Sequence, residues 1–133
     1  MRQISRQEDY GIFLMDKLAK NFGCGSVSLA TIADESKISV FFLKQLASKL
    51  RKAGLIKSKE GIGGGYKLTR SPKKITVGEI ISVFSGPLEL VECCDLSKKI
   101  NCKLADLCHS KSALRKINQE LVARLNSLTL ASI

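Results

Sequence analysis

The sequence predicts a mainly α-helical protein with one small β-hairpin and a long helix near its C-terminus. Three patterns among its 133 residues predict this fold class. Apolar residues recur at three- and four-residue steps, which is the period of amphipathic helices. Four glycines at positions 61 and 63 to 65 separate two short β-compatible runs, and this arrangement predicts a hairpin. Five apolar residues beyond residue 110 follow a 3-4-4-3 spacing, which is typical of a narrow seam on one helix.

Three helices are predicted before the hairpin. The first lies between residues 4 and 22 and ends at Gly23. Ser28 is a suitable N-cap for a short second helix, and Ser39 for a third that runs to residue 53, where Gly54 stops it. Two short helices joined by a tight polar turn indicate a helix-turn-helix.

The hairpin and a fourth helix follow. Residues 55 to 59 and 66 to 70 are the predicted strands, and a hairpin directly after a helix-turn-helix is a wing. Thr76 and Glu79 form a capping-box pattern ahead of a fourth helix, which ends at Gly86 and Pro87. The predicted organisation is a winged helix-turn-helix domain over residues 1 to 87, a cysteine-containing loop over 88 to 109 and a C-terminal helical region over 110 to 133.

The charge of the chain is concentrated in one stretch. Lys and Arg number 22 against 12 Asp and Glu, which gives a net charge of +10 at pH 7. Residues 44 to 74 carry ten basic side chains and one acidic side chain, so nine of the ten net charges lie on the third helix and the hairpin. A basic helix beside a basic wing predicts a nucleic-acid surface. Seven Phe and Tyr residues and no Trp offer little for base stacking, which favours duplex DNA over single strands or RNA.

The third helix has one apolar face and one polar face. Leu43, Leu46 and Leu50 fall within about 60° of one another at 100° per residue, and we expect them to be buried. Long polar side chains near the helix start can reach base edges, and cations near its end can reach phosphates. The predicted DNA-binding residues of helix and wing are Ser39, Phe41, Lys44, Gln45, Ser48, Arg51, Lys52, Lys57, Lys59 and Lys67.

Four of the five cysteines lie within a 16-residue segment, apart from Cys24. Cys94, Cys102 and Cys108 are separated by seven and five residues. All three can bind one metal centre only if part of the segment wraps as a loop. Soft thiolates in a loop suit an iron–sulfur cluster, whereas zinc sites more often use pairs about two to four residues apart. Spacing alone leaves iron–sulfur binding, zinc binding, thiol switching and buried structural cysteines open. The candidates for a fourth cluster ligand are Cys93, His109, Asp9 and Glu8.

Three segments carry a resemblance to a known family. They are the block LKQLASKLRKAGLIKSKEGIGGGYKLTRSPKKIT at 43 to 76, the block VGEIISVFSGP at 77 to 87, and the three-cysteine segment. The chain resembles the Rrf-type winged-helix transcription regulators. The resemblance implies a homodimeric repressor or activator on a palindromic operator in duplex DNA, with recognition helices in successive major grooves and wings at the flanking minor grooves. It also implies that the long C-terminal helix crosses its partner, with dimerisation residues Leu114, Ile117, Leu121, Leu125 and Leu128.

The resemblance also implies a ligand set for an iron–sulfur cluster. By position, the family's cluster cysteines fall on Cys94, Cys102 and Cys108. In some members a carboxylate just before an aromatic residue of the first helix completes the cluster from the other subunit, and here Asp9 precedes Tyr10. Lys111 stands where other members have a ligating histidine, so Asp9 is the first choice. The less favoured fourth ligands are Glu8, Cys93 and His109. Two-iron and four-iron clusters are both compatible with the long first cysteine gap.

One acidic residue interrupts the basic stretch. Glu60 stands where the family often has a wing-tip arginine. Phosphates repel a carboxylate, so we expect minor-groove contact from Lys57, from Lys59 or from neither.

The sequence therefore predicts a cytoplasmic transcription regulator whose DNA binding is controlled by an iron–sulfur cluster. The first alternative is a metal-free regulator of the same fold that works by thiol chemistry or through a partner protein. The second is an iron–sulfur electron carrier. An enzyme is not expected, because one histidine and no paired-carboxylate motif or nucleophile elbow leave little for a catalytic site. No apolar run approaches the roughly 18 residues of a membrane span.

Overall fold

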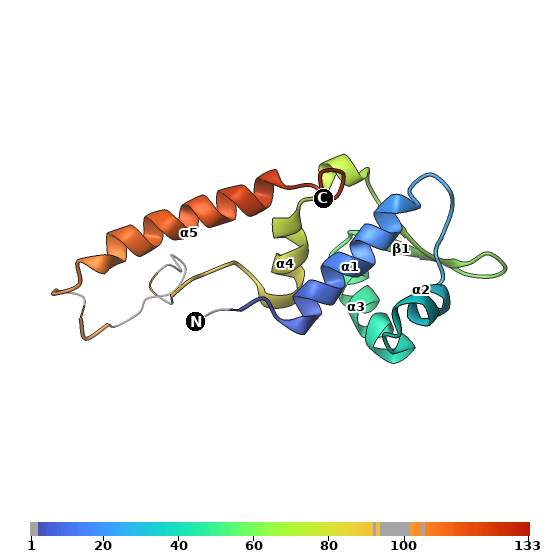
Figure 1. Cartoon of the computed structure of the whole chain (residues 1–133), viewed down its shortest axis with the longest axis horizontal. Coiled ribbons are helices and arrows are strands. Elements are labelled where there is room, and N and C mark those ends of the chain that lie inside the picture. Colours follow the sequence, from blue (N-terminus) through green and yellow to red (C-terminus); the bar gives the residue numbers. More distant parts are fainter. Residues whose placement is uncertain (1–2, 92, 94–101, 105) are drawn as a thin grey trace.

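The computed structural model describes residues 3 to 91, 93, 102 to 104 and 106 to 133. This part of the chain is mainly helical, with one antiparallel hairpin and a long last helix (Figure 1). The predicted fold class is therefore confirmed. The elements are α1 (Arg6–Lys20), α2 (Leu29–Ser36), α3 (Val40–Lys52), β1 (Ile56–Lys59), β2 (Gly65–Leu68), the 3₁₀ helix η1 (Pro72–Lys74), α4 (Val77–Ser85) and α5 (Ser110–Ser127).

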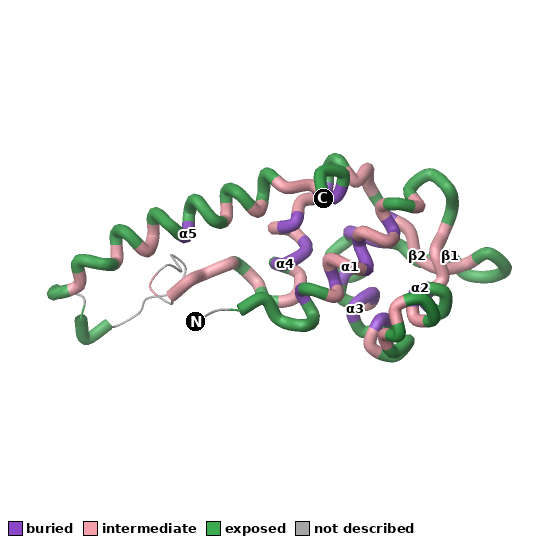
Figure 2. The backbone as a smooth tube through the Cα atoms, in the orientation of Figure 1, coloured by how far each residue is buried: buried purple, intermediate pink, exposed green. Residues whose placement is uncertain are grey.

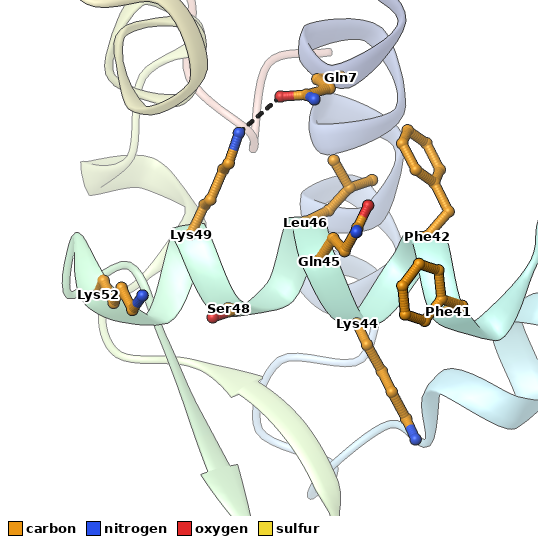
Figure 3. Close-up of a pocket in the computed structure, with 9 residues that line it drawn as sticks. All are labelled: Gln7, Phe41, Phe42, Lys44, Gln45, Leu46, Ser48, Lys49 and Lys52. Carbon is orange, nitrogen blue, oxygen red and sulfur yellow. Dashed lines mark hydrogen bonds between the residues drawn. The ribbon is translucent and has the colours of Figure 1, made fainter.

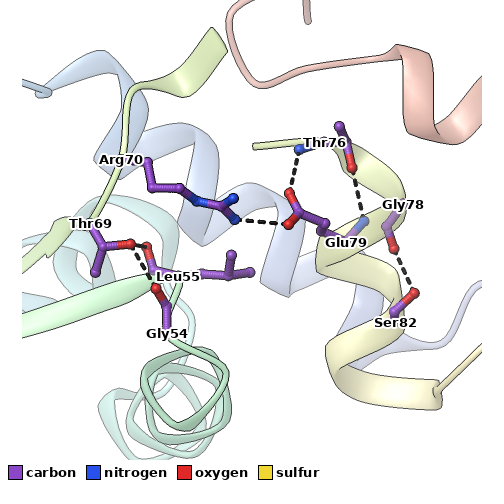
Figure 4. A network of polar contacts seen from close by, with 8 residues as sticks. All are labelled: Gly54, Leu55, Thr69, Arg70, Thr76, Gly78, Glu79 and Ser82. Carbon is purple, nitrogen blue, oxygen red and sulfur yellow. Dashed lines mark hydrogen bonds and ion pairs between the residues drawn. The ribbon is translucent and has the colours of Figure 1, made fainter. Parts of the chain in front are cut away.

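Helices α2, α3 and α4 begin at the polar residues that the sequence marks as caps. Ser28 and Ser39 each accept a hydrogen bond from a backbone N–H in the first turn of α2 and α3. At the start of α4 the Thr76 hydroxyl accepts from the Glu79 N–H, and the Glu79 carboxylate accepts from the Thr76 N–H, both at 3.1 Å (Figure 4). These caps satisfy N–H donors that the first helical turn leaves unpaired, so these polar residues fix where the three helices start.

The core lies where α1 packs against α3, α4 and the hairpin. Leu43, Leu46 and Leu50 are at most 1% exposed, so the predicted apolar face of α3 is confirmed. Figure 2 shows the buried positions gathered on α1, α3 and α4. α1 and α4 approach closely at Gly11, where an added Cβ would collide with the Phe84 ring. The packed core holds α3 with its other face toward solvent.

The wing is a two-stranded antiparallel hairpin with a defined register. Ile56 pairs with Leu68 at its base, and both side chains are buried. Val27, just before α2, adds a short bridge to Tyr66, with both backbone hydrogen bonds at 2.8 Å. The wing is therefore tied to the helix-turn-helix at its base, while residues 59 to 63 at its tip are exposed.

Helix α5 begins away from the winged domain and runs back toward it, so that the C-terminus lies at the domain (Figure 1). After α5 the Leu128 carbonyl accepts from the Val77 N–H at 2.8 Å, and the Leu130 N–H donates to the Ile75 carbonyl at 3.0 Å. Leu130 is 3% exposed and belongs to the core. The C-terminal tail is thus part of the packed domain, a feature that helical periodicity does not indicate.

Candidate functional site

The outward face of α3 presents polar and aromatic side chains over a shallow groove (Figure 3). Lys44 and Gln45 are exposed and Phe41 is 72% exposed. Of the other predicted helix residues, Arg51 and Lys52 are exposed and Ser48 is half-buried, while Ser39 caps the helix. The structure brings together on this groove the predicted residues Phe41, Lys44, Gln45, Ser48 and Lys52.

Sequence reasoning did not include Gln7 and Lys49 among the residues of this groove. Lys49 reaches from α3 to α1, where its Nζ donates to the Gln7 Oε1 at 2.8 Å (Figure 3). The same ammonium lies 5.9 Å from the centroid of the Phe84 ring on α4. Lys49 therefore links three helices, and the only sequence signal for it was its place in the basic stretch.

The wing lysines share one face of the hairpin. Lys57 and Lys67 are directly opposite each other in the register, and Lys59 faces Gly65 two residues further along β1. Side chains alternate along a strand, so all three lie on the face opposite the buried pair at the wing base. Like charges directly opposite each other destabilise a hairpin. An anionic partner would remove this repulsion.

Arg70, one of the ten cations in the basic stretch, is occupied within the fold. Its guanidinium donates to the Glu79 Oε1 at 2.8 Å (Figure 4). Burial opposes ionisation of Glu79, but hydrogen bonds from Arg70 and the Thr76 N–H together lower the pKa of the carboxyl below its usual value. The pair joins the end of the wing to the start of α4 and leaves the lysines as the free cations of the wing face.

The cysteine segment is described in part. Cys94 lies outside the described residues, Cys102 is exposed, and Cys108 is half-buried two residues before the start of α5. The Cys108 sulfur lies 3.3 Å from the Ser110 hydroxyl. This hydrogen bond lowers the pKa of the Cys108 thiol, and the backbone N–H groups of Ser110 and Lys111 act in the same direction. Cys108 is thus biased toward the thiolate, the form that binds metals and reacts with oxidants.

The candidate fourth ligands occupy different environments. Asp9 is exposed on α1, and His109 is exposed at the start of α5. Glu8 is 1% exposed and serves the fold: its carboxylate accepts from the Ser5 N–H and from the Ser85 hydroxyl. Among the residues that the structure describes, no three His, Cys, Asp or Glu side chains form a group that could hold a metal ion.

Two α5 side chains hold the chain that leads into the cysteine segment. The Asn118 amide accepts from the Leu90 N–H at 2.9 Å and donates to the Leu88 carbonyl at 3.2 Å. Asn118 is the buried residue of α5. One turn earlier, the Arg115 guanidinium donates to the Cys93 carbonyl at 3.4 Å. We call these two residues the α5 clamp. No spacing rule marks them, because their partners are backbone groups far away in sequence.

The predicted dimerisation seam divides into two environments. Ile117 and Leu121 are 51% and 37% exposed, whereas Leu125 lines a groove between α4 and α5. Leu114 is half-buried, and Leu128 follows the last turn of α5. The single chain therefore leaves the middle of the seam open to solvent.

A protein-family model described as "Rrf2: Iron-dependent Transcriptional regulator" matches residues 4 to 133. The chain belongs to the Rrf2 family. The predicted resemblance is confirmed, and the family consists of transcriptional regulators rather than enzymes.

Two of the relatives similar to this chain are CymR and IscR proteins. CymR of Bacillus subtilis (strain 168), an HTH-type transcriptional regulator, is 47% identical over 90 residues, which span 68% of this chain and 65% of that protein. IscR of Klebsiella pneumoniae (strain 342) is 36% identical over 124 residues, 93% of this chain and 74% of that protein. The alignment with CymR thus spans slightly less than two thirds of that relative.

A solved structure supports the same assignment. The structure of B. subtilis CymR, named as the global cysteine regulator, superposes with a TM-score of 0.82 and 37% identity over 99% of this chain and 95% of that one. The winged-helix architecture is therefore shared along nearly the whole Rrf2 chain. Within the described residues, no helix is long and apolar enough to cross a membrane.

Proposed function

We propose that this Rrf2-family chain is a homodimeric, sequence-specific regulator that binds a palindromic operator in duplex DNA. Residues 1 to 87 bind DNA, residues 88 to 109 sense a signal, and residues 110 to 133 pair the subunits. The observation that carries the proposal is the outward face of α3, which exposes Lys44 and Gln45 beside a wing with three lysines on one face. A helix with this polar face fits the major groove.

Salt dependence of binding tests the DNA half of the proposal. Each phosphate contact that is lost should reduce the slope of log affinity against log salt by about 0.9. We expect Lys44→Ala and Lys67→Ala each to weaken binding to a selected duplex and to flatten this slope. Lys116→Ala is the matched control, since Lys116 is an exposed lysine on α5. Unchanged slopes for both surface variants would contradict the phosphate assignment.

The sensor half of the proposal is an iron–sulfur cluster, of two or four irons, in the cysteine segment. The ligands would be Cys94, Cys102 and Cys108, with Asp9 of the other subunit as the fourth. The IscR relatives and the thiolate bias of Cys108 support this choice. Such a cluster supplies a group whose charge or presence changes with redox state, nitric oxide or iron supply. The chain would hold the segment through the α5 clamp, so that a change there reaches α5.

Anaerobic purification tests the sensor half. We expect a coloured protein with visible absorption and with iron and acid-labile sulfide, lost in the triple Ala variant of Cys94, Cys102 and Cys108. Replacing Cys24, the exposed cysteine after α1, by Ala is the matched control and should keep the colour. A wild-type protein that stays colourless and free of iron after reconstitution would refute the proposed cluster. It would not affect the proposed DNA binding.

A metal-free thiol regulator is the second candidate. The relation to CymR and the lowered pKa of Cys108 favour it, because thiolates are the reactive form of cysteine. It predicts that peroxide changes the DNA affinity of chelator-treated protein and that Cys108→Ala abolishes this response. An unaltered affinity after peroxide would exclude it.

A further inference from the structure

We propose that Phe41 reads the C5-methyl group of a thymine in the operator, so that A·T pairs lie under the start of α3. This inference rests on the proposed DNA binding and adds the identity of the bases. It concerns the most exposed apolar side chain in the first turn of α3: Phe41 is 72% exposed, two residues after the Ser39 cap, whereas the neighbouring Val40 is 37% exposed.

The neighbouring phenylalanine shows that this exposure is not a general property of the helix start. Phe42 packs edge-on against Tyr10 of α1, with ring centroids 5.7 Å apart. In Figure 3 Phe42 is turned toward α1, while Lys44 extends away from it. Phe42 therefore has a role in the fold. Phe41 lies outside the partly buried residues that pack on the core, so its aromatic ring is available for a ligand.

The chemistry of the major groove identifies that ligand. Residues in the first turns of a recognition helix contact base edges. The thymine methyl is the apolar group that these edges present, and Phe is among the side chains that contact it. When the helix enters the groove and the neighbouring lysines bind phosphates, the exposed ring would pack against this methyl group. Both apolar surfaces would then be removed from water.

Gln45 points to the same base pairs. It lies one turn after Phe41 on the exposed face of α3 and lines the same groove. The glutamine amide can bond both N6 and N7 of adenine. Two side chains on adjacent turns thus favour the two partners of an A·T pair, which gives the recognition helix a consistent preference.

The experiment removes the methyl group from the DNA and the ring from the protein. Binding duplexes are first selected from a random pool, and each thymine is then replaced by deoxyuridine, which keeps the base pair. We expect one position per half-site to cost the wild type about fourfold in affinity, equivalent to roughly 0.8 kcal/mol for one buried methyl-sized group. Phe41→Ala should bind more weakly, with the wild-type salt slope, and should not respond to deoxyuridine at that position. Phe41→Leu should keep part of the response.

Phe22→Ala is the matched control, because Phe22 is 48% exposed in the turn after α1. It should respond to deoxyuridine as the wild type does. Tight binding with no deoxyuridine-sensitive position, or a sensitive position that persists in Phe41→Ala, would overturn the role of Phe41 while leaving DNA binding established. Failure to select any duplex would overturn the proposed function and this inference together.

Discussion

Replacing Lys67 in the wing should stabilise the free protein and weaken its complex with DNA. Lys67 faces Lys57 directly across the hairpin, and like charges in this position cost about 0.2–1 kcal/mol. Lys67→Gln keeps most of the side chain and removes the repulsion. In urea unfolding followed by circular dichroism at low salt, the variant should therefore unfold at a slightly higher denaturant concentration than the wild type.

The same substitution should have the opposite sign in DNA binding. One lost phosphate contact lowers the salt slope by about 0.9. Over a fourfold rise in salt, the wild type should then lose roughly 3.5-fold more affinity than the variant. Fluorescence anisotropy with a selected duplex measures both slopes. Equal slopes, or a variant that is less stable than the wild type at low salt, would refute the idea that the wing face is arranged for an anion.

Stability, pH dependence and assembly each provide one further test. Leu130→Ala should lower the free energy of unfolding in urea by about 2–5 kcal/mol, because Leu130 is 3% exposed in the core. Ile133→Ala, at a residue that is 54% exposed, should change stability by less than about 0.5 kcal/mol. Similar values for the two variants would refute the packing of the C-terminal tail against the core. The pKa of Glu79 is lowered in the fold, so its contribution is present above its unfolded pKa and is lost as pH falls through the folded pKa. The wild type should thus lose more stability than Glu79→Gln between about pH 6 and pH 3, by less than about 1 kcal/mol for this half-exposed pair, and parallel pH profiles would count against it. Leu121→Lys should yield monomers in size-exclusion chromatography with light scattering. Gln119→Lys adds the same charge at another exposed α5 position and should stay dimeric. A dimeric Leu121→Lys variant would refute the role of the seam in dimerisation.

The parts of the fold that sequence could predict are those set by local rules. The leucines of α3 repeat at helical spacing, and their burial follows from that spacing alone. The capping box of Thr76 and Glu79 is a pattern of near neighbours, so the start of α4 is visible in the sequence. For the same reason the cation-rich face of α3 and the wing could be placed before any coordinates.

The features that sequence could not supply depend on contacts between distant segments. Arg70 counts as a free cation until the fold places Glu79 beside it. Leu130 lies beyond the predicted seam, which ends at Leu128, and the tail turns back and buries it beside Ile75. Asn118 belongs to no repeating sequence pattern, and its hydrogen-bond partners are backbone groups 28 and 30 residues away. In each case a long-range contact decides the role.

The long-range contacts also suggest how the cysteine segment could act on DNA binding. The α5 clamp holds Leu88, Leu90 and Cys93 at the start of the cysteine-containing loop, and Cys108 lies two residues before α5 begins. At its other end α5 continues into the tail that bonds Ile75 and Val77, between the wing and α4. Under the proposed sensor function, a rearrangement among the cysteines would shift α5, whose other end is bonded through the tail to Ile75 and Val77 at the start of α4. If α5 also pairs the two subunits, the same motion changes the distance between their α3 helices, and a palindromic operator is sensitive to that distance.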